Sequence, residues 1–268
     1  MITDWDDAYT IMDHIPGSEA FPERWAADAA AFRASHPPRV LRYGDHPRQA
    51  VDVFLPDGAP RGLAIWVHGG YWSRFDRRDW SHYAAGARAR GWAVALPGYV
   101  LAPEARISTI TADIARAVTL AAREIAGPIR LSGHSAGGHL VTRQICDDSA
   151  LSAEVLARIE LTLPISGLFD LRPLLRIQRN LDSFRLDAAE AAAESPALRA
   201  PVDGARVRAW VGAAERPEFV RQNALIANVW NGLGADIVET VEPGADHFTI
   251  IDPLTDPSSH VVEVFVGD

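Results

Sequence analysis

Strand-like runs alternate with helix-length segments over most of this 268-residue chain, and this order restricts its possible folds more than any other feature. The run at 62–67 is apolar throughout, which is typical of a strand buried on both faces of a parallel sheet. Further strands are predicted at 92–96, 128–131, 161–165, 206–211 and 236–241. Helices are predicted between them at 79–90, 108–125 and 217–230, and a turn followed by a helix is predicted at 133–146. The alternation therefore predicts an α/β protein with a mostly parallel sheet and helices on both faces.

The segments outside this alternation are predicted to belong to the same domain, 1–268. A helix is expected at 19–34, short strands at 39–43 and 50–55, and a loop with a final helix at 248–266. In the strand at 50–55, Asp52 and Phe54 are expected on a partly exposed face, opposite a buried one. Residues 169–204 carry no strand pattern, and we expect them to form a small helical, cap-like insertion.

Composition excludes several kinds of chemistry. All 26 basic residues are arginines, so a Schiff-base lysine and a lysine-dependent phosphate loop are both excluded. The formal net charge of −9 argues against a nucleic-acid partner, and a small-molecule substrate is expected instead. The single cysteine, Cys146, is expected to be a buried, inert thiol rather than a nucleophile or a metal ligand. Homodimer formation stays open.

The sequence also carries no targeting signal that we recognise. It begins with acidic residues and no apolar stretch follows them, whereas a secretory signal needs a basic start and an apolar run. No run of 18 apolar residues occurs, so no membrane span is expected. A chain with one cysteine and no signal is expected in the cytoplasm.

The strongest chemical signal is Gly-His-Ser-Ala-Gly at 133–137, which matches the G-x-S-x-G nucleophile elbow. In this turn a serine lies between a strand and a helix with strained backbone angles. Only glycine at 133 and 137 lets the chain pass that closely. An apolar strand precedes the motif and a helical segment follows it, which is the context the motif requires. Ser135 is therefore the predicted nucleophile.

A second motif, His-Gly-Gly-Tyr-Trp at 68–72, follows an earlier apolar strand. Acyl transfer passes through a tetrahedral oxyanion, which needs N–H donors already in place. One donor is expected from the residue after the nucleophile, Ala136, and the other from a glycine-rich loop such as this one. The candidates in the loop are Gly69, Gly70 and Tyr71.

Several side chains near these motifs are expected to bound the substrate pocket. Tyr71 and Trp72 on the loop are predicted to form its wall, together with His134 beside the nucleophile and Phe248 near the end of the chain. His68 is more consistent with a structural residue that braces the loop.

Three histidines follow Ser135 and could act as its base: His139, His247 and His260. In this fold the chain order is serine, acid, histidine. His139 lies one helical turn beyond the nucleophile and is expected to pack there, and His260 is expected to be exposed. His247 follows the last predicted strand, where the base should lie, and is the predicted base.

The acid that orients the histidine has two candidate positions. Glu215 follows the strand at 206–211, and Asp170 follows the strand at 161–165. Glu215 is the favoured acid and Asp170 the alternative. Asp246 is adjacent to His247 in the chain and would point away from its ring. Glu218 is expected to be an exposed residue of a first helical turn, where the helix dipole favours it.

Taken together, the motifs at 68–72 and 133–139 and the Pro-Glu-Phe at 217–219 resemble the α/β-hydrolases of the kynurenine formamidase (arylformamidase) type. The resemblance runs from about residue 20 to the end of the chain. Tyr99, Leu101 and Pro103 also resemble the wider esterase/lipase group. The family has an aspartate two residues before Pro-Glu-Phe, so its acid role falls on Glu215, and glutamate there is a departure from the pattern.

The resemblance implies an α/β-hydrolase fold and hydrolysis of N-formylkynurenine to formate and kynurenine. We expect an acyl-enzyme mechanism without a metal or other cofactor. The arginines at 172, 176 and 179 are candidates for binding a substrate carboxylate. Two alternatives stay open: a general short-chain carboxylesterase, and a non-catalytic binding protein with the hydrolase fold.

Overall fold

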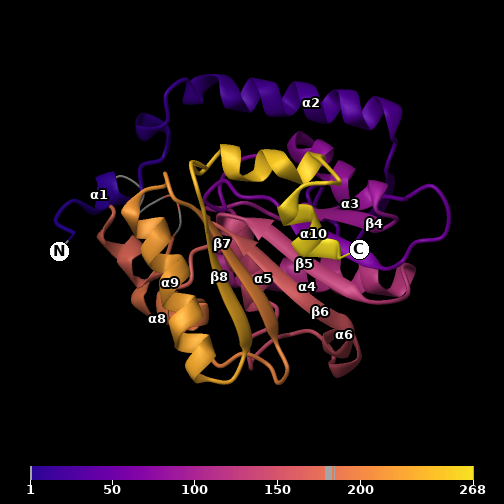
Figure 1. Ribbon diagram of the computed structural model, residues 1–268. Coiled ribbons are helices and arrows are strands. Elements are labelled where there is room, and N and C mark those ends of the chain that lie inside the picture. Colours follow the sequence, from indigo (N-terminus) through magenta and orange to yellow (C-terminus); the bar gives the residue numbers. More distant parts are fainter. Residues whose placement is uncertain (1, 179–182, 184, 268) are drawn as a thin grey trace.

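A computed structural model of the protein describes residues 2–178, 183 and 185–267. Eight strands form one sheet in the order β1-β2-β4-β3-β5-β6-β7-β8 (Figure 1). Pairing is antiparallel between β1 and β2 and between β2 and β4, and parallel from β4 to β8. The strands are β1 (Arg39–Arg42), β2 (Ala50–Phe54), β3 (Leu63–Val67), β4 (Ala93–Pro97), β5 (Ile129–His134), β6 (Ile159–Ile165), β7 (Arg206–Gly212) and β8 (Asp236–Glu242).

Helices cover both faces of this sheet, as the alternation predicts. One face is packed by α2 (Phe21–Ser35), η3 (Arg77–Ala84), α3 (Ala85–Ala89), η6 (Thr249–Thr255) and α10 (His260–Val266). The other is packed by α4 (Ile107–Glu124), α5 (Ala136–Arg143), α6 (Ala153–Arg158), α8 (Ala188–Ala193) and α9 (Pro217–Gly232). Short elements complete the chain: α1 (Trp5–Ala8), η1 (Met12–His14), η2 (Ser18–Ala20), η4 (Arg172–Arg176) and η5 (Pro196–Leu198). In Figure 1, α2 runs across the top of the molecule and α9 lies at its lower left.

The central strands are apolar at every position because each strand contributes side chains to two hydrophobic cores, one on each face of the sheet. In β3, Leu63, Ile65 and Val67 belong to the core under α4 and α5, whereas Ala64 and Trp66 belong to the core under η3 and α10. Successive side chains of a strand point to opposite faces, so a strand covered on both sides needs apolar residues at every position. The parallel sheet is thereby sealed on both faces.

The prediction that β2 has a partly exposed face is wrong, because all five of its residues are buried. Asp52 accepts hydrogen bonds from Arg33 of α2, at 2.5 Å, and from Arg77 of η3, at 3.0 Å. Phe54 packs against Phe32 of the same helix. Helix α2 therefore covers the face that the alternation of polar and apolar residues marks as open, and the two guanidinium groups neutralise the buried carboxylate.

Two other segments differ in detail from the pattern. The helix expected at 79–90 is a tighter 3-10 helix over 77–84 that continues as α3. The short helix α6 before β6 was not predicted. Between β6 and β7, the described residues form only the short elements η4, α8 and η5. None of the helices in the described part of the chain has the length and apolar character needed to cross a membrane.

Candidate active site

Ser135 occupies a sharp turn between β5 and α5, with backbone angles φ 55° and ψ −117°. A side chain in this region is strained, and the crowding around the turn explains why glycines flank it. A Cβ on Gly133 would lie 2.5 Å from the carbonyl carbon of Gly137, and one on Gly137 would lie 2.8 Å from the carbonyl oxygen of His68. The strand–turn–helix context predicted for the elbow is present.

The register of the sheet brings the second motif to this turn. Strands β3 and β5 pair in parallel with Val67 opposite Gly133, so the loop after β3 begins beside the elbow. A Cβ on Gly69 would lie 3.0 Å from the Cβ of Ser135. The loop continues through three residues with positive φ, Gly70, Tyr71 and Trp72. Its backbone is thus held against the serine.

The helix α5 begins at Ala136, so the N–H of Ala136 lies at a helix N-terminus, where an anion is favoured. Within the described residues, the N–H groups of Ala136 and Gly70 have no hydrogen-bond acceptor. Gly70 and Tyr71 line the cavity in front of Ser135, whereas Gly69 packs behind it. The geometry therefore favours the amides of Gly70, Tyr71 and Ala136 over that of Gly69 as oxyanion donors.

Glu215 and His247 form a buried, hydrogen-bonded pair. His247 Nδ1 lies 2.6 Å from Glu215 Oε2. Glu215 Oε1 accepts hydrogen bonds from Ser166 Oγ, at 2.5 Å, and from the backbone N–H of Gly212, at 2.8 Å. Because a carboxylate only accepts, this contact requires the proton of the neutral imidazole to be on Nδ1, which leaves Nε2 able to accept one.

The extra methylene of glutamate is accommodated by a close approach of two loops. Gly212 ends β7, and a Cβ there would lie 2.8 Å from the carbonyl carbon of Ala245, in the loop that carries His247. The backbone N–H of Ala214 donates to the carbonyl of Ala245 at 3.0 Å. These contacts hold the Glu215 turn against the His247 loop.

The alternative acid, Asp170, is bound by another residue in this arrangement. The Asp170 carboxylate is bound by Arg172, with both oxygens 2.9 Å from guanidinium nitrogens, and these contacts lower the pKa of Asp170 against the opposing effect of burial. The expectation that Glu218 is exposed is wrong. Its side chain is buried and accepts hydrogen bonds from Tyr9 and Gln222.

Three further histidines near the site are buried and neutral. Burial lowers the pKa of His68 and of His139 to about 4. His139 Nε2 lies 2.7 Å from the carbonyl of Glu194, and Nδ1 accepts from the indole of Trp72 at 3.2 Å. Burial, reinforced by the neighbouring His247, places the pKa of His134 well below its usual range. Because a lowered pKa makes an imidazole a weaker base, these three rings are less suited than an ordinary histidine to taking a proton.

A cavity of about 690 Å³ opens in front of the serine, and Ser135 and His247 both line it. Among the described residues they are not hydrogen-bonded to each other, and such contacts often tighten only when substrate binds. Tyr71, His134 and Phe248 line the cavity as well, whereas Trp72 does not. Trp72 is fully buried, since the positive φ at this position turns its indole into the core against His139.

One wall of the cavity comes from the N-terminal segment, which sequence reasoning missed. Residues 9–13 line it, and the segment is anchored by the buried Tyr9 and the half-buried Tyr71. Tyr9 donates to Glu218 Oε1 at 2.7 Å, and the hydroxyl of Tyr71 donates to the carbonyl of Tyr9. The partners in the first contact are 209 residues apart in sequence, so no local pattern reveals this wall.

Two of the three arginines expected as candidates for binding a substrate carboxylate do not line the cavity. Arg172 is taken up by Asp170, and Arg176 lies over the ring of Trp5. Arg179 lies outside the described residues. A different arginine, Arg74, lines the cavity just beyond the motif at 68–72.

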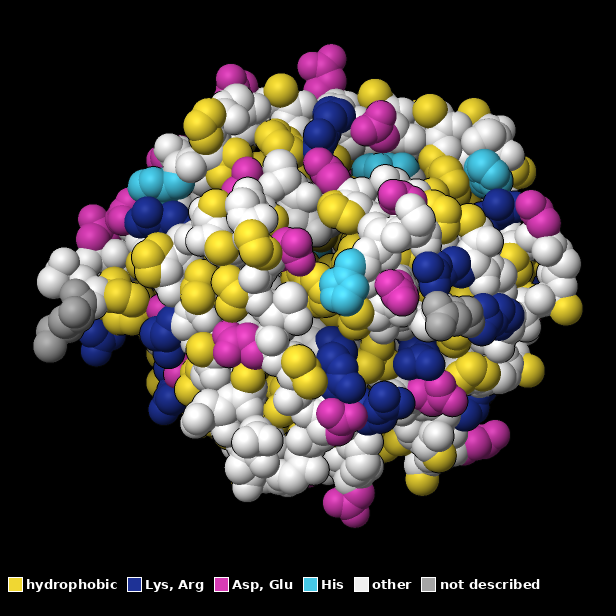
Figure 2. Space-filling view, viewed as in Figure 1, with side chains coloured by type: hydrophobic (Ala, Val, Ile, Leu, Met, Phe, Trp, Pro, Cys, Tyr) yellow, Lys and Arg dark blue, Asp and Glu magenta, His cyan; other side chains and the backbone are white. Residues whose placement is uncertain are grey.

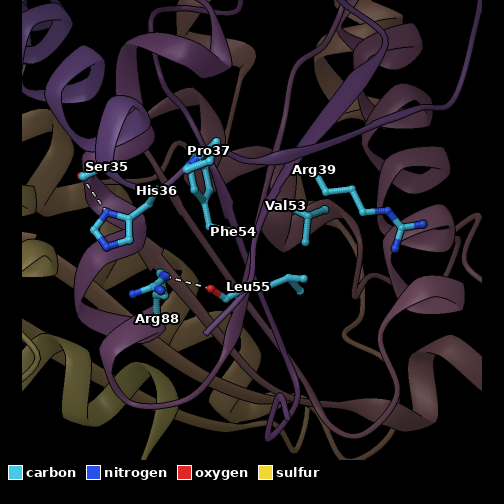
Figure 3. A pocket seen from close by; sticks show the side chains of 8 residues that line it. All are labelled: Ser35, His36, Pro37, Arg39, Val53, Phe54, Leu55 and Arg88. Carbon is cyan, nitrogen blue, oxygen red and sulfur yellow. Dashed lines mark hydrogen bonds between the residues drawn. The ribbon is translucent and has the colours of Figure 1, made fainter. Parts of the chain in front are cut away.

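Other features of the described residues differ in character from this site. Figure 3 shows a second hollow of about 230 Å³, in which Ser35 contacts His36 and Arg88 donates to the carbonyl of Leu55. Acidic and basic side chains are interspersed over the face seen in Figure 2. Cys146 is buried, which raises the pKa of its thiol to about 12. Across the described ranges, no three His, Cys, Asp or Glu side chains are grouped as metal ligands.

Comparison with known proteins agrees with this geometry. The family model described as alpha/beta hydrolase fold matches residues 64–247, which span the loop after β3, the elbow and His247. The chain belongs to this family of hydrolases. It is also 26% identical over 224 residues to the kynurenine formamidase of Danio rerio, covering 80% of this chain and 75% of that protein.

Two further proteins extend the comparison. The kynurenine formamidase of Salmo salar is 26% identical over 235 residues, covering 84% of this chain and 79% of the relative. A crystal structure from Silicibacter, described as a "putative thioesterase", is 49% identical with a TM-score of 0.92 and covers 98% of both chains. The family fold and the arylformamidase and esterase resemblance expected from the motifs are confirmed.

Proposed function

We propose that this hydrolase is a serine enzyme that cleaves small acyl amides, with aryl formamides such as N-formylkynurenine as substrates. The observation that carries the proposal is the buried Glu215–His247 pair beside Ser135 at one cavity. This set provides a nucleophile, a base with Nε2 free and a carboxylate that fixes the imidazole tautomer. The formamidases of Danio rerio and Salmo salar indicate the substrate class.

In this mechanism Ser135 attacks the formyl carbon as His247 Nε2 takes the hydroxyl proton. The negative charge on the carbonyl oxygen is stabilised by the amide of Ala136 and by the loop at 70–71. The C–N bond then breaks, and His247 protonates the departing arylamine. A water molecule, deprotonated by the same imidazole, hydrolyses the formyl ester of Ser135 to release formate.

An ester or thioester substrate is the second candidate function, because the Silicibacter relative is described as a "putative thioesterase" and is 49% identical. The two candidates differ in the acyl group. Formyl is the smallest acyl group, and a formamidase gains from a tight acyl site, whereas an esterase must accept longer chains.

A substrate panel separates these candidates: N-formylkynurenine, p-nitrophenyl acetate and butyrate, and the matching acyl thioesters. We expect the highest kcat/KM on the aryl formamide. A strong preference for longer acyl esters or thioesters would overturn the formamidase assignment while leaving the serine mechanism intact.

The Ser135→Ala variant tests the mechanism itself, since it removes the nucleophile from a turn that needs no side chain there. We expect turnover of every substrate to be lost while the thermal unfolding transition stays close to that of the wild type. Retained turnover in this variant would overturn the serine mechanism, and an inactive wild type would favour a non-catalytic binding protein.

A further inference from the structure

The described lining of the Ser135 cavity includes one carboxylic acid side chain, Asp13, and one guanidinium side chain, Arg74. Both residues are exposed. Over residues 2–178, 183 and 185–267, neither side chain takes part in an ion pair or a hydrogen bond. A carboxylate and a guanidinium that line one cavity can bind a ligand when they do not pair with each other or with neighbouring residues.

Unlike Arg74, two neighbouring arginines form ion pairs. Arg77 is buried in ion pairs with Asp52 and Asp76, and Arg48 also pairs with Asp76. These contacts hold the loop after β3 in place. Arg74 is left out of this network, so its guanidinium has no structural task among the described residues.

The backbone of Arg74 is nevertheless fixed relative to Ser135. The carbonyl oxygen of Gly70 accepts from the backbone N–H groups of Ser73, at 3.0 Å, and Arg74, at 2.9 Å. A Cβ on Gly70 would lie 2.7 Å from the carbonyl oxygen of Arg74. The guanidinium therefore projects from a tight turn that directly follows the oxyanion loop.

Asp13 belongs to the N-terminal segment that forms another part of the cavity wall. It lies in η1, whose Met12 carbonyl accepts from Ser18 Oγ at 2.8 Å and from the backbone N–H of Ile15 at 3.2 Å. The preceding residues are anchored through Tyr9, as described above. The two charges thus come from separate, braced segments that meet at the cavity.

We propose that Arg74 and Asp13 are specificity-determining residues that bind, respectively, the carboxylate and the ammonium of an α-amino acid carried by the leaving group. This inference rests on the proposed function and deepens it. The guanidinium of Arg74 offers a planar set of donors suited to a carboxylate, and the Asp13 carboxylate accepts from an ammonium group. A neutral aryl formamide fits the same catalytic centre but leaves both charges without partners.

The experiment compares three formamides: N-formylkynurenine, its des-amino analogue, and ortho-acetylformanilide, which lacks both charged groups. Two ratios of kcat/KM are measured for each variant. The first is that of N-formylkynurenine, a zwitterion, to that of ortho-acetylformanilide, which is neutral. The second is that of the des-amino analogue, an anion, to that of the same neutral compound. We expect Arg74→Gln to lower both ratios about 10- to 100-fold, as for loss of a charge-assisted hydrogen-bond pair. We expect Asp13→Asn to lower the first ratio about tenfold and to leave the second unchanged.

Arg78→Gln is the matched control, because Arg78 is an exposed arginine of the same region that does not line the cavity. We expect it to leave both ratios at the wild-type values. Ratios that are unchanged in Arg74→Gln, or that fall equally in Arg74→Gln and Arg78→Gln, would overturn the inference.

A binding measurement separates failure of this inference from failure of the proposed function. Kynurenine, the product, is tested as a competitive inhibitor of p-nitrophenyl acetate hydrolysis, which requires no formamide turnover. If the wild type cleaves no formamide, the proposed substrate is wrong. The residues are then judged by the inhibition constant alone, which we expect Arg74→Gln to raise about 10- to 100-fold. An unchanged inhibition constant would overturn the role of Arg74.

Discussion

Replacing Glu215 with glutamine keeps the length of the side chain and removes its charge, so it isolates the role of the carboxylate. The wild-type carboxylate accepts from Ser166, Gly212 and His247, at 2.5, 2.8 and 2.6 Å. In the variant, the amide oxygen can still accept from the first two donors. The amide nitrogen, which only donates, is then left facing His247 Nδ1.

This reversal forces His247 into the other tautomer, with its proton on Nε2 and a lone pair on Nδ1. An Nε2 that already carries a proton cannot take the proton of Ser135. The developing imidazolium also loses a buried counter-charge. Together these effects predict a loss of about 10³- to 10⁴-fold in kcat, equivalent to about 4–5.5 kcal/mol of transition-state stabilisation.

The assay is the steady-state hydrolysis of p-nitrophenyl acetate and of the aryl formamide near pH 7. Asp170→Asn is the matched control, since it removes a charge that faces Arg172 instead of His247. We expect it to stay within a few fold of the wild type. A Glu215→Gln enzyme within tenfold of the wild type, or a larger loss in Asp170→Asn, would refute the assignment of the acid.

Two further predictions concern stability. Gly137→Ala would place a Cβ 2.6 Å from the carbonyl carbon of Val67, and we expect a loss of at least about 3 kcal/mol in the free energy of unfolding by urea denaturation. Gly232→Ala, where a Cβ meets nothing within 4 Å, should change it by no more than about 1 kcal/mol, and an equal loss in both would refute the crowding argument. Because burial lowers the pKa of His139 to about 4, below the unfolded value of about 6.5, the unfolded state binds the extra proton between these values. The free energy of unfolding should therefore fall as pH falls through that window, and His139→Gln should reduce the fall by about 2 kcal/mol at pH 5, whereas an identical pH profile would contradict it.

The sheet and the elbow could be predicted because their signals are local. A strand buried on both faces requires an uninterrupted apolar run, as in β3. The crowded turn at Ser135 requires glycines on either side of it. The positions of Glu215 and His247 follow from the chain order and the family resemblance. Whether a glutamate reaches the histidine depends on how two loops approach each other, and only the structure gives that distance.

Several of the differences between the predictions and the structure arise because the interacting partners are far away in sequence. Asp52 follows an alternating pattern, yet it is buried by arginines from α2 and η3. Glu218 is buried by a tyrosine near the start of the chain. The orientation of Trp72 depends on a positive φ that its residue type does not indicate. Arg74 and Asp13 line one cavity although they lie 61 positions apart in the chain.

The wall formed by residues 9–13 has a consequence for how this enzyme can diversify. The segment adds no strand to the sheet, and it is attached mainly through Tyr9, whose hydroxyl and carbonyl hold it to Glu218 and Tyr71. The exposed residues of this segment, Met12 and Asp13, can therefore be exchanged while that anchor and the elbow stay unchanged. Selection can reshape what enters the cavity without disturbing the bond-breaking groups, so substrate range and chemistry can evolve on separate parts of one chain.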